Sequence, residues 1–173
     1  MTHQPPQAQF VVSEAAPSKE QFSLARIQMI ESFVRLEAEI TKIILRFEPQ
    51  FEAGSPLISK LNKLKTFGKL EKGQLSEKAA KRFEGLGYEI AKQTKIRNDL
   101  VHGIMTVVIH EGVAKAALQN ATDLAKEFPQ FTLLAITDLD EGRKQLNNVA
   151  NQLKQLTNPP SPPQPSPGAT TGP

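Results

Sequence analysis

The 173-residue sequence contains no cysteine, no tryptophan and only three histidines. Without cysteine, the chain has no thiol nucleophile, no disulfide within it and no cysteine-ligated zinc or iron–sulfur site. The histidines match no paired-histidine metal pattern, and the acidic residues are scattered among lysines rather than grouped. We therefore expect no metal and no cofactor.

Long apolar runs are also missing. No segment approaches the roughly 18 apolar residues that a membrane-spanning helix requires. The first ten residues, MTHQPPQAQF, have neither the basic start nor the apolar core of a signal peptide. Together with the lack of cysteine, these absences lead us to expect a cytoplasmic protein with no membrane contact.

Proline is unevenly distributed, because ten of the 13 prolines lie before residue 18 or after residue 158. The remaining stretch, about 140 residues, is long enough for one domain with a real core. We predict a flexible lead at 1–17 and one domain at 18–157. The tail at 158–173 has no periodicity and almost no apolar content, which predicts disorder.

Apolar residues recur at helical spacing in three segments before residue 104. The first, 18–48, opens with the capping box Ser18-Lys19-Glu20-Gln21 and stops before Pro49. The second begins at Ser55-Pro56, with Ser as the expected N-cap and Pro as the first helical residue. The third begins at the N-cap Ser76 and ends at Gly103.

The periodicity then changes to short β-prone runs. Three strands are expected, at Ile104–Ile109, Val113–Leu118 and Phe131–Ile136. A hairpin turn at residues 110–112 is expected between the first two. A last helix is expected from Asp138. The predicted fold is therefore a mainly α helical bundle with a small antiparallel β insertion, about 104–136, between the third and last helices.

The end of the third predicted helix combines Arg97, Asn98 and His102 in the run RNDLVH, followed by Gly103. A guanidinium binds phosphate oxygens in a planar, bidentate way, and an imidazole gives or takes a proton near neutral pH. On an ideal helix, Arg97 and His102 point about 140° apart, so both reach one ligand only if the last turn loosens. A purely structural role is the competing interpretation, because cationic residues stabilise a helix C-terminus.

At these residues the chain resembles the HEPN superfamily of nucleotide-binding helical bundles, whose motif is Arg, usually then Asn, Asp or His, and a His four to six residues after the Arg. The resemblance implies a metal-independent endoribonuclease, often a toxin or defence effector with a cognate antitoxin or other inhibitor protein. It implies a homodimer in which two motifs meet. Arg97 would hold the scissile phosphate, Asn98 would orient the Arg or bind the phosphate, and His102 would act as general base. Other members are non-catalytic modules that bind RNA, nucleotides or proteins, and that alternative stays open.

A basic segment leads into this motif. Residues 55–98 contain 11 Lys and Arg residues against four acidic ones, a local charge of +7 in a chain whose net charge is +3. Phosphate neutralisation supplies most sequence-independent RNA affinity. We therefore name Lys81, Arg82, Lys92 and Lys95 as candidate RNA-binding residues. A solvated lysine face is the other interpretation.

Overall fold

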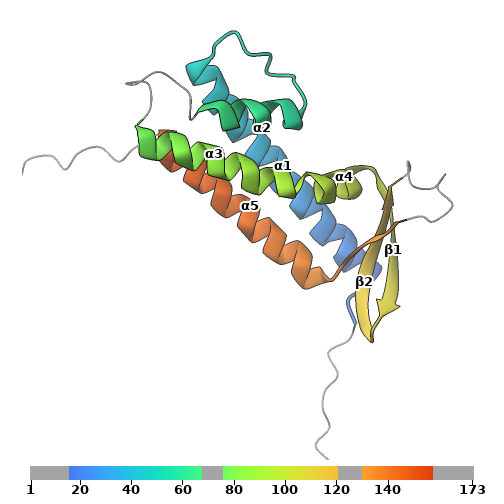
Figure 1. The fold of residues 1–173 in the computed structure, drawn as a ribbon. Coiled ribbons are helices and arrows are strands. Elements are labelled where there is room, and N and C mark those ends of the chain that lie inside the picture. Colours follow the sequence, from blue (N-terminus) through green and yellow to red (C-terminus); the bar gives the residue numbers. More distant parts are fainter. Residues whose placement is uncertain (1–15, 68–75, 121–129, 158–173) are drawn as a thin grey trace, which may run out of the picture.

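The computed structural model describes residues 16–67, 76–120 and 130–157. Within them the chain forms five helices and three strands in the order α1 (Lys19–Phe47), α2 (Leu57–Thr66), α3 (Glu77–Lys92), α4 (Thr94–His102), β1 (Gly103–His110), β2 (Val113–Asn120), β3 (Thr132–Leu134) and α5 (Ile136–Thr157) (Figure 1). The predicted mainly helical fold, with a small antiparallel sheet before the last helix, is confirmed. Most of the predicted lead and all of the predicted tail lie outside the described residues.

Local signals set both ends of α1. The Ser18 hydroxyl accepts a hydrogen bond from the Gln21 N–H (3.3 Å), and the Gln21 side-chain oxygen accepts one from the Ser18 N–H (2.7 Å). This is the capping box that the sequence predicts. The helix ends at Phe47, and Glu48 caps it immediately before Pro49. The 29-residue helix is therefore the longest scaffold element among the described residues.

The third predicted helix is wrong as one piece, because the structure divides it at Gln93 into α3 and α4. The Gln93 N–H donates to the carbonyl of Ile90, three residues back, at 2.9 Å, so the helical ladder tightens here. The Thr94 hydroxyl donates to the Ala91 carbonyl (2.8 Å) and competes with the backbone for it. As a result, Arg97 and His102 lie on a separate nine-residue helix.

Other predicted boundaries also move. Pro56 itself is the N-cap of α2, and no side chain caps that helix, so the expected cap at Ser55 is wrong. The third strand is only three residues long. The last helix begins at Ile136, two residues before the predicted start, and the Asp138 carboxylate accepts the Ala135 N–H at 2.7 Å. That bond satisfies a backbone donor at the start of the helix.

The sheet has the order β1-β2-β3 and is antiparallel throughout. Glu111 and Gly112 both have positive φ, 54° and 76°, as a two-residue hairpin turn between right-twisted strands requires. On β2, Ala114, Ala116 and Leu118 are buried in the core. The sheet therefore covers one end of the helical layer.

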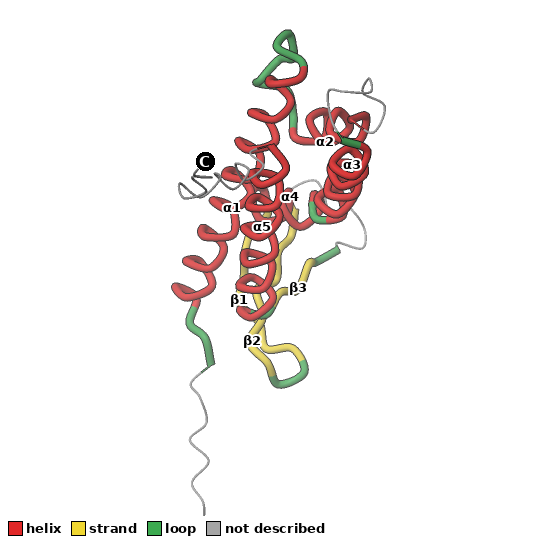
Figure 2. Tube along the Cα trace, turned by 90° about the vertical axis from the view of Figure 1, so that its left-hand side faces the viewer, coloured by secondary structure: helices red, strands yellow, loops and turns green. Residues whose placement is uncertain are grey.

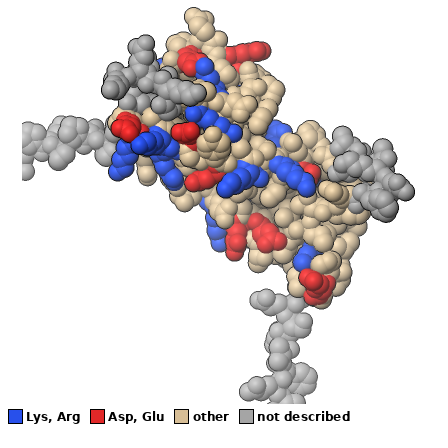
Figure 3. All heavy atoms as spheres, in the orientation of Figure 1, with Lys and Arg blue, Asp and Glu red and all other residues tan. Residues whose placement is uncertain are grey.

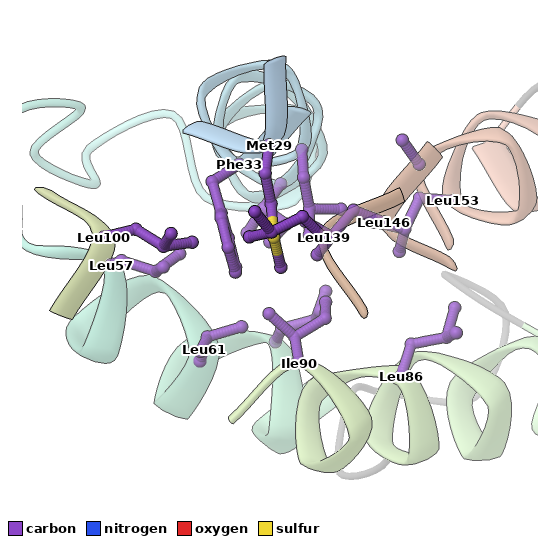
Figure 4. Close-up of a cluster of buried hydrophobic side chains, with 14 of the residues drawn as sticks. Met29, Phe33, Leu57, Leu61, Leu86, Ile90, Leu100, Leu139, Leu146 and Leu153 are labelled. Carbon is purple, nitrogen blue, oxygen red and sulfur yellow. The ribbon is translucent and has the colours of Figure 1, made fainter. Parts of the chain in front are cut away.

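One core joins the helices. α1 contacts α2, α4 and α5, while α3 packs against α2 and α5 (Figures 1 and 2). Figure 4 shows side chains from all five helices meeting in this core: Met29, Phe33, Leu57, Leu61, Leu86, Ile90, Leu100, Leu139, Leu146 and Leu153. At one end the rings of Phe47, Phe67 and Phe83 stack edge to face, with centroids 5.3 and 5.7 Å apart. Among the described helices, none is both long and apolar enough to cross a membrane.

One ion pair reaches into this core. Lys60 Nζ lies 2.7 Å from Glu37 Oε1, and the two side chains are only 7% and 25% exposed. We expect Lys60→Met to lower the free energy of unfolding by about 2 kcal/mol, because the carboxylate loses its charged donor in a poorly solvated position. Urea denaturation followed by circular dichroism measures the change.

Lys42 supplies the matched control. Its Nζ lies 3.0 Å from Glu39 Oε1, yet its side chain is 71% exposed. Lys42→Met is expected to change stability by less than about 1 kcal/mol, as solvated pairs usually do. Equal losses for the two variants would show that the burial of Lys60 adds nothing.

Candidate functional site

The helix α4 presents the three motif residues differently. Asp99 and Leu100 are buried and attach the helix to the core, whereas Asn98 and His102 are exposed one turn apart. Arg97 is partly buried at the edge between these faces. The helix thus holds Asn98 and His102 on a common solvent face, with Arg97 beside it.

A hydrogen bond connects Arg97 to that solvent face. Arg97 Nη1 donates to Asn98 Oδ1 at 3.3 Å. The predicted angular separation of about 140° between Arg97 and His102 is therefore partly bridged, since Asn98 lies about 40° from His102 on a helix. Within the described part of the chain, no carboxylate pairs with the Arg97 guanidinium. Among the described residues, Asn98 is its hydrogen-bond partner.

The His102 ring is exposed, and no described side chain or backbone group hydrogen-bonds to it. The ring is therefore accessible to a ligand. Catalytic bases are usually oriented by a third group, as in Ser-His-Asp triads. No such group contacts His102 in the described residues of this single chain.

Arg26 on α1 holds the end of α4. Its Nε donates to the Leu100 carbonyl at 2.7 Å, and its Nη2 donates to the Gly103 carbonyl at 2.9 Å. Carbonyls at a helix C-terminus lack partners within the helix, and a cation there also stabilises the helix dipole. Sequence reasoning missed Arg26, because nothing in the sequence connects it to residues more than 70 positions away. It fixes the backbone that carries His102.

Asp99 is buried in the fold, although it directly follows the exposed Asn98. It is only 6% exposed, and its Oδ2 accepts a hydrogen bond from the Thr132 hydroxyl at 2.6 Å. This bond ties β3 to α4. Asp99 therefore faces the interior, whereas Asn98 faces the solvent.

Thr132→Val is expected to lower the free energy of unfolding by about 2 kcal/mol, because Asp99 loses a hydrogen bond to a charged acceptor. Thr106, which is exposed on β1, provides the same substitution without a buried partner. Thr106→Val should change stability by less than about 0.5 kcal/mol. Chemical denaturation of both variants tests this, and equal effects would contradict the role of the Asp99 bond.

The four candidate RNA-binding cations fall into two groups. Lys81 Nζ lies 2.8 Å from Glu77, and Arg82 lies 3.6 Å from Glu89 while also donating to Gln152. The hydrogen bond to Glu77 and the negative charge of that residue raise the pKa of Lys81. The same hydrogen bond and the positive charge of Lys81 lower the pKa of Glu77. Lys92 and Lys95 are exposed and form no ion pair with a described residue. Their positive charges are the less compensated ones.

Two adjoining hollows run between α3 and α5, of about 650 and 350 Å³. The larger is lined by Lys81 and Arg82, the smaller by Lys92, and Gln152 lines both. In Figure 3 Lys and Arg side chains lie along α3 and α4, with acidic side chains among them. In the part of the chain that the structure describes, no three His, Asp or Glu side chains are grouped as a metal site would need.

Comparison with known proteins adds no relative. No family model matches the chain, and neither a curated protein nor a solved structure matches it. The resemblance to HEPN proteins therefore remains an expectation from the sequence motif at residues 97–103.

Proposed function

We propose that this chain is a metal-independent endoribonuclease of HEPN type, which works as a cytoplasmic homodimer and cleaves RNA through Arg97 and His102. Arg97 and Asn98 bind the scissile phosphate. His102 takes the proton from the ribose 2′-hydroxyl, whose oxygen attacks phosphorus while the bond to the 5′-oxygen breaks. His102 of the partner subunit gives a proton to that leaving oxygen. The products are a 2′,3′-cyclic phosphate and a free 5′-hydroxyl.

The observation that carries the proposal is that no described ion pair involves the Arg97 guanidinium. It contacts a neutral amide, Asn98, and no described carboxylate neutralises it. A preorganised cation aimed at a phosphate stabilises the charge that develops on it during transfer. The exposed His102 lies on the neighbouring face of the same nine-residue helix, so acid–base and anion-binding groups occur together.

A second candidate is a non-catalytic dimeric module that binds RNA, a nucleotide or a protein such as an antitoxin. The lack of any described group that orients the His102 ring favours this candidate. The uncompensated charges of Lys92 and Lys95 serve binding alone, through phosphate neutralisation. For such a module, substitutions of Lys92 and Lys95 lower RNA affinity more than a substitution of His102 does.

One experiment separates the candidates. Purified protein is incubated with a mixed-sequence RNA in EDTA, and product ends are examined for 2′,3′-cyclic phosphate. Cleavage with such ends supports the ribonuclease. Salt-sensitive RNA binding without turnover, weakened by Lys92→Ala and Lys95→Ala, supports the binding module. If the protein neither cleaves nor binds RNA at any salt concentration, Arg97 and His102 serve only to end a helix.

A further inference from the structure

The outer face of α1 carries exposed apolar side chains opposite its buried face. Leu24, Ile27 and Val34 are 57%, 54% and 62% exposed. Together with Glu31 and Ala38, these residues form a line of exposed side chains along the helix, at alternating steps of three and four residues. We call this line the outer stripe: Leu24, Ile27, Glu31, Val34 and Ala38. This spacing is that of the a and d positions of a coiled coil.

Isolated exposed apolar residues are common, but a line of them at helix–helix spacing marks a contact surface. The opposite side of α1 already packs in the core through Phe22, Met29, Phe33 and Leu36. A helix that is apolar on two faces is built to pack on both. The outer stripe is therefore a surface against which a second helix can pack.

The charges on this face select a second copy of the chain in antiparallel orientation. Glu31 and Arg35 are both exposed, and neither pairs with a described residue. A two-fold axis between Ser32 and Phe33 places Glu31 of each subunit beside Arg35 of the partner subunit. A parallel pair would instead place Glu31 beside Glu31 of the partner subunit and repel it.

The sizes of the side chains agree with this orientation. The stripe is large at its N-terminal end, with Leu24 and Ile27, and small at Ala38. The antiparallel pair sets Ile27 against Ala38 of the partner subunit, so a large side chain meets a small one as knobs-into-holes packing requires. From the charges and the sizes together, we infer that the outer stripe of α1 is a homodimer interface that pairs two α1 helices antiparallel.

This interface has a consequence for the motif. Arg26 fixes the end of α4 to α1, and in the inferred register the two Arg26 residues lie 13 positions apart along the paired helices. At 1.5 Å per residue, that is about 20 Å. The inferred dimer therefore carries two copies of α4, whose Arg26 contacts are offset by this distance along the paired helices. The inference rests on the homodimer of the proposed function, and it does not depend on cleavage.

Oligomeric state tests the interface directly. Light scattering after size exclusion should give twice 19.0 kDa for the full chain. Ile27→Glu should give monomers, whereas Ile58→Glu, at an apolar residue on α2 that is 51% exposed, should leave the dimer intact. Circular dichroism confirms that each variant keeps its helices.

A charge-reversal pair tests the orientation. Glu31→Arg and Arg35→Glu should each raise the dissociation constant about 100-fold, and the double variant should restore it, because only the antiparallel pair exchanges the two charges. A monomeric wild-type protein, an unaffected Ile27→Glu dimer, or a double variant as weak as the singles would overturn the inference. RNA cleavage measured on the same samples reports separately on the proposed ribonuclease.

Discussion

His102→Ala is expected to lower the rate of RNA cleavage by about 10²–10⁴-fold, the usual contribution of a general acid or base. His102 carries the one imidazole on α4, and the guanidinium of Arg97 lies on the same helix. Initial rates in EDTA at saturating RNA measure the effect. Stability should not change, because His102 is exposed and has no described hydrogen-bond partner.

His110 provides the control for this substitution. It lies at the hairpin between β1 and β2, where its Nδ1 is 3.2 Å from Lys115 Nζ and 3.4 Å from Glu111. His110→Ala removes the same side chain from an exposed position outside α4, so cleavage should proceed as in the wild type. If His102→Ala also cleaves RNA at the wild-type rate, His102 is no catalytic residue.

Arg97→Lys separates phosphate geometry from charge at the same site. Lysine keeps the positive charge but loses the planar pair of donors that a guanidinium offers to a phosphate. If Arg97 binds the transition state bidentately, the lysine variant should recover little of the activity that alanine loses. Full activity with lysine would show that a point charge is enough.

The sequence predicts those parts of the fold that depend on local chemistry. The start of α1 follows from Ser18 and Gln21, whose side chains and backbone groups satisfy one another within one turn. The hairpin follows from Glu111-Gly112, where the turn demands positive φ. These elements are formed by residues that are neighbours in the chain, so their signals can be recognised without the tertiary structure.

Sequence reasoning missed one local break in a helix and several contacts between distant segments. The division between α3 and α4 leaves the apolar spacing unchanged, because it arises from local rearrangement of carbonyl partners around Gln93. The Arg26 contacts with α4 and the bond between Asp99 and Thr132 join segments that are far apart in sequence. Of the candidate site, the sequence supplies the residue types, while the contacts of Arg26 and Thr132 that hold α4 in place come from elsewhere in the fold.

Gly103→Ala is expected to lower the free energy of unfolding by about 3 kcal/mol, the upper part of the range for overpacking. Its φ and ψ, −79° and 144°, suit any residue, so conformational freedom is not the reason for glycine here. A Cβ at this position would lie 2.3 Å from the Asp99 carbonyl oxygen, which accepts the Gly103 N–H. The last turn of α4 would have to move, and the bond between Arg26 and the Gly103 carbonyl would move with it.

Gly85→Ala is the same glycine-to-alanine change, but it is expected to raise rather than lower the free energy of unfolding. Gly85 lies inside α3, and a Cβ there would meet nothing within 4 Å. Alanine should therefore raise stability by about 1 kcal/mol, the difference in helix propensity. Urea denaturation of both variants tests the pair. A Gly103→Ala protein as stable as the wild type would show that the junction of α4 and β1 adjusts freely, and the backbone beside His102 would then be less rigidly held than the Arg26 contacts indicate.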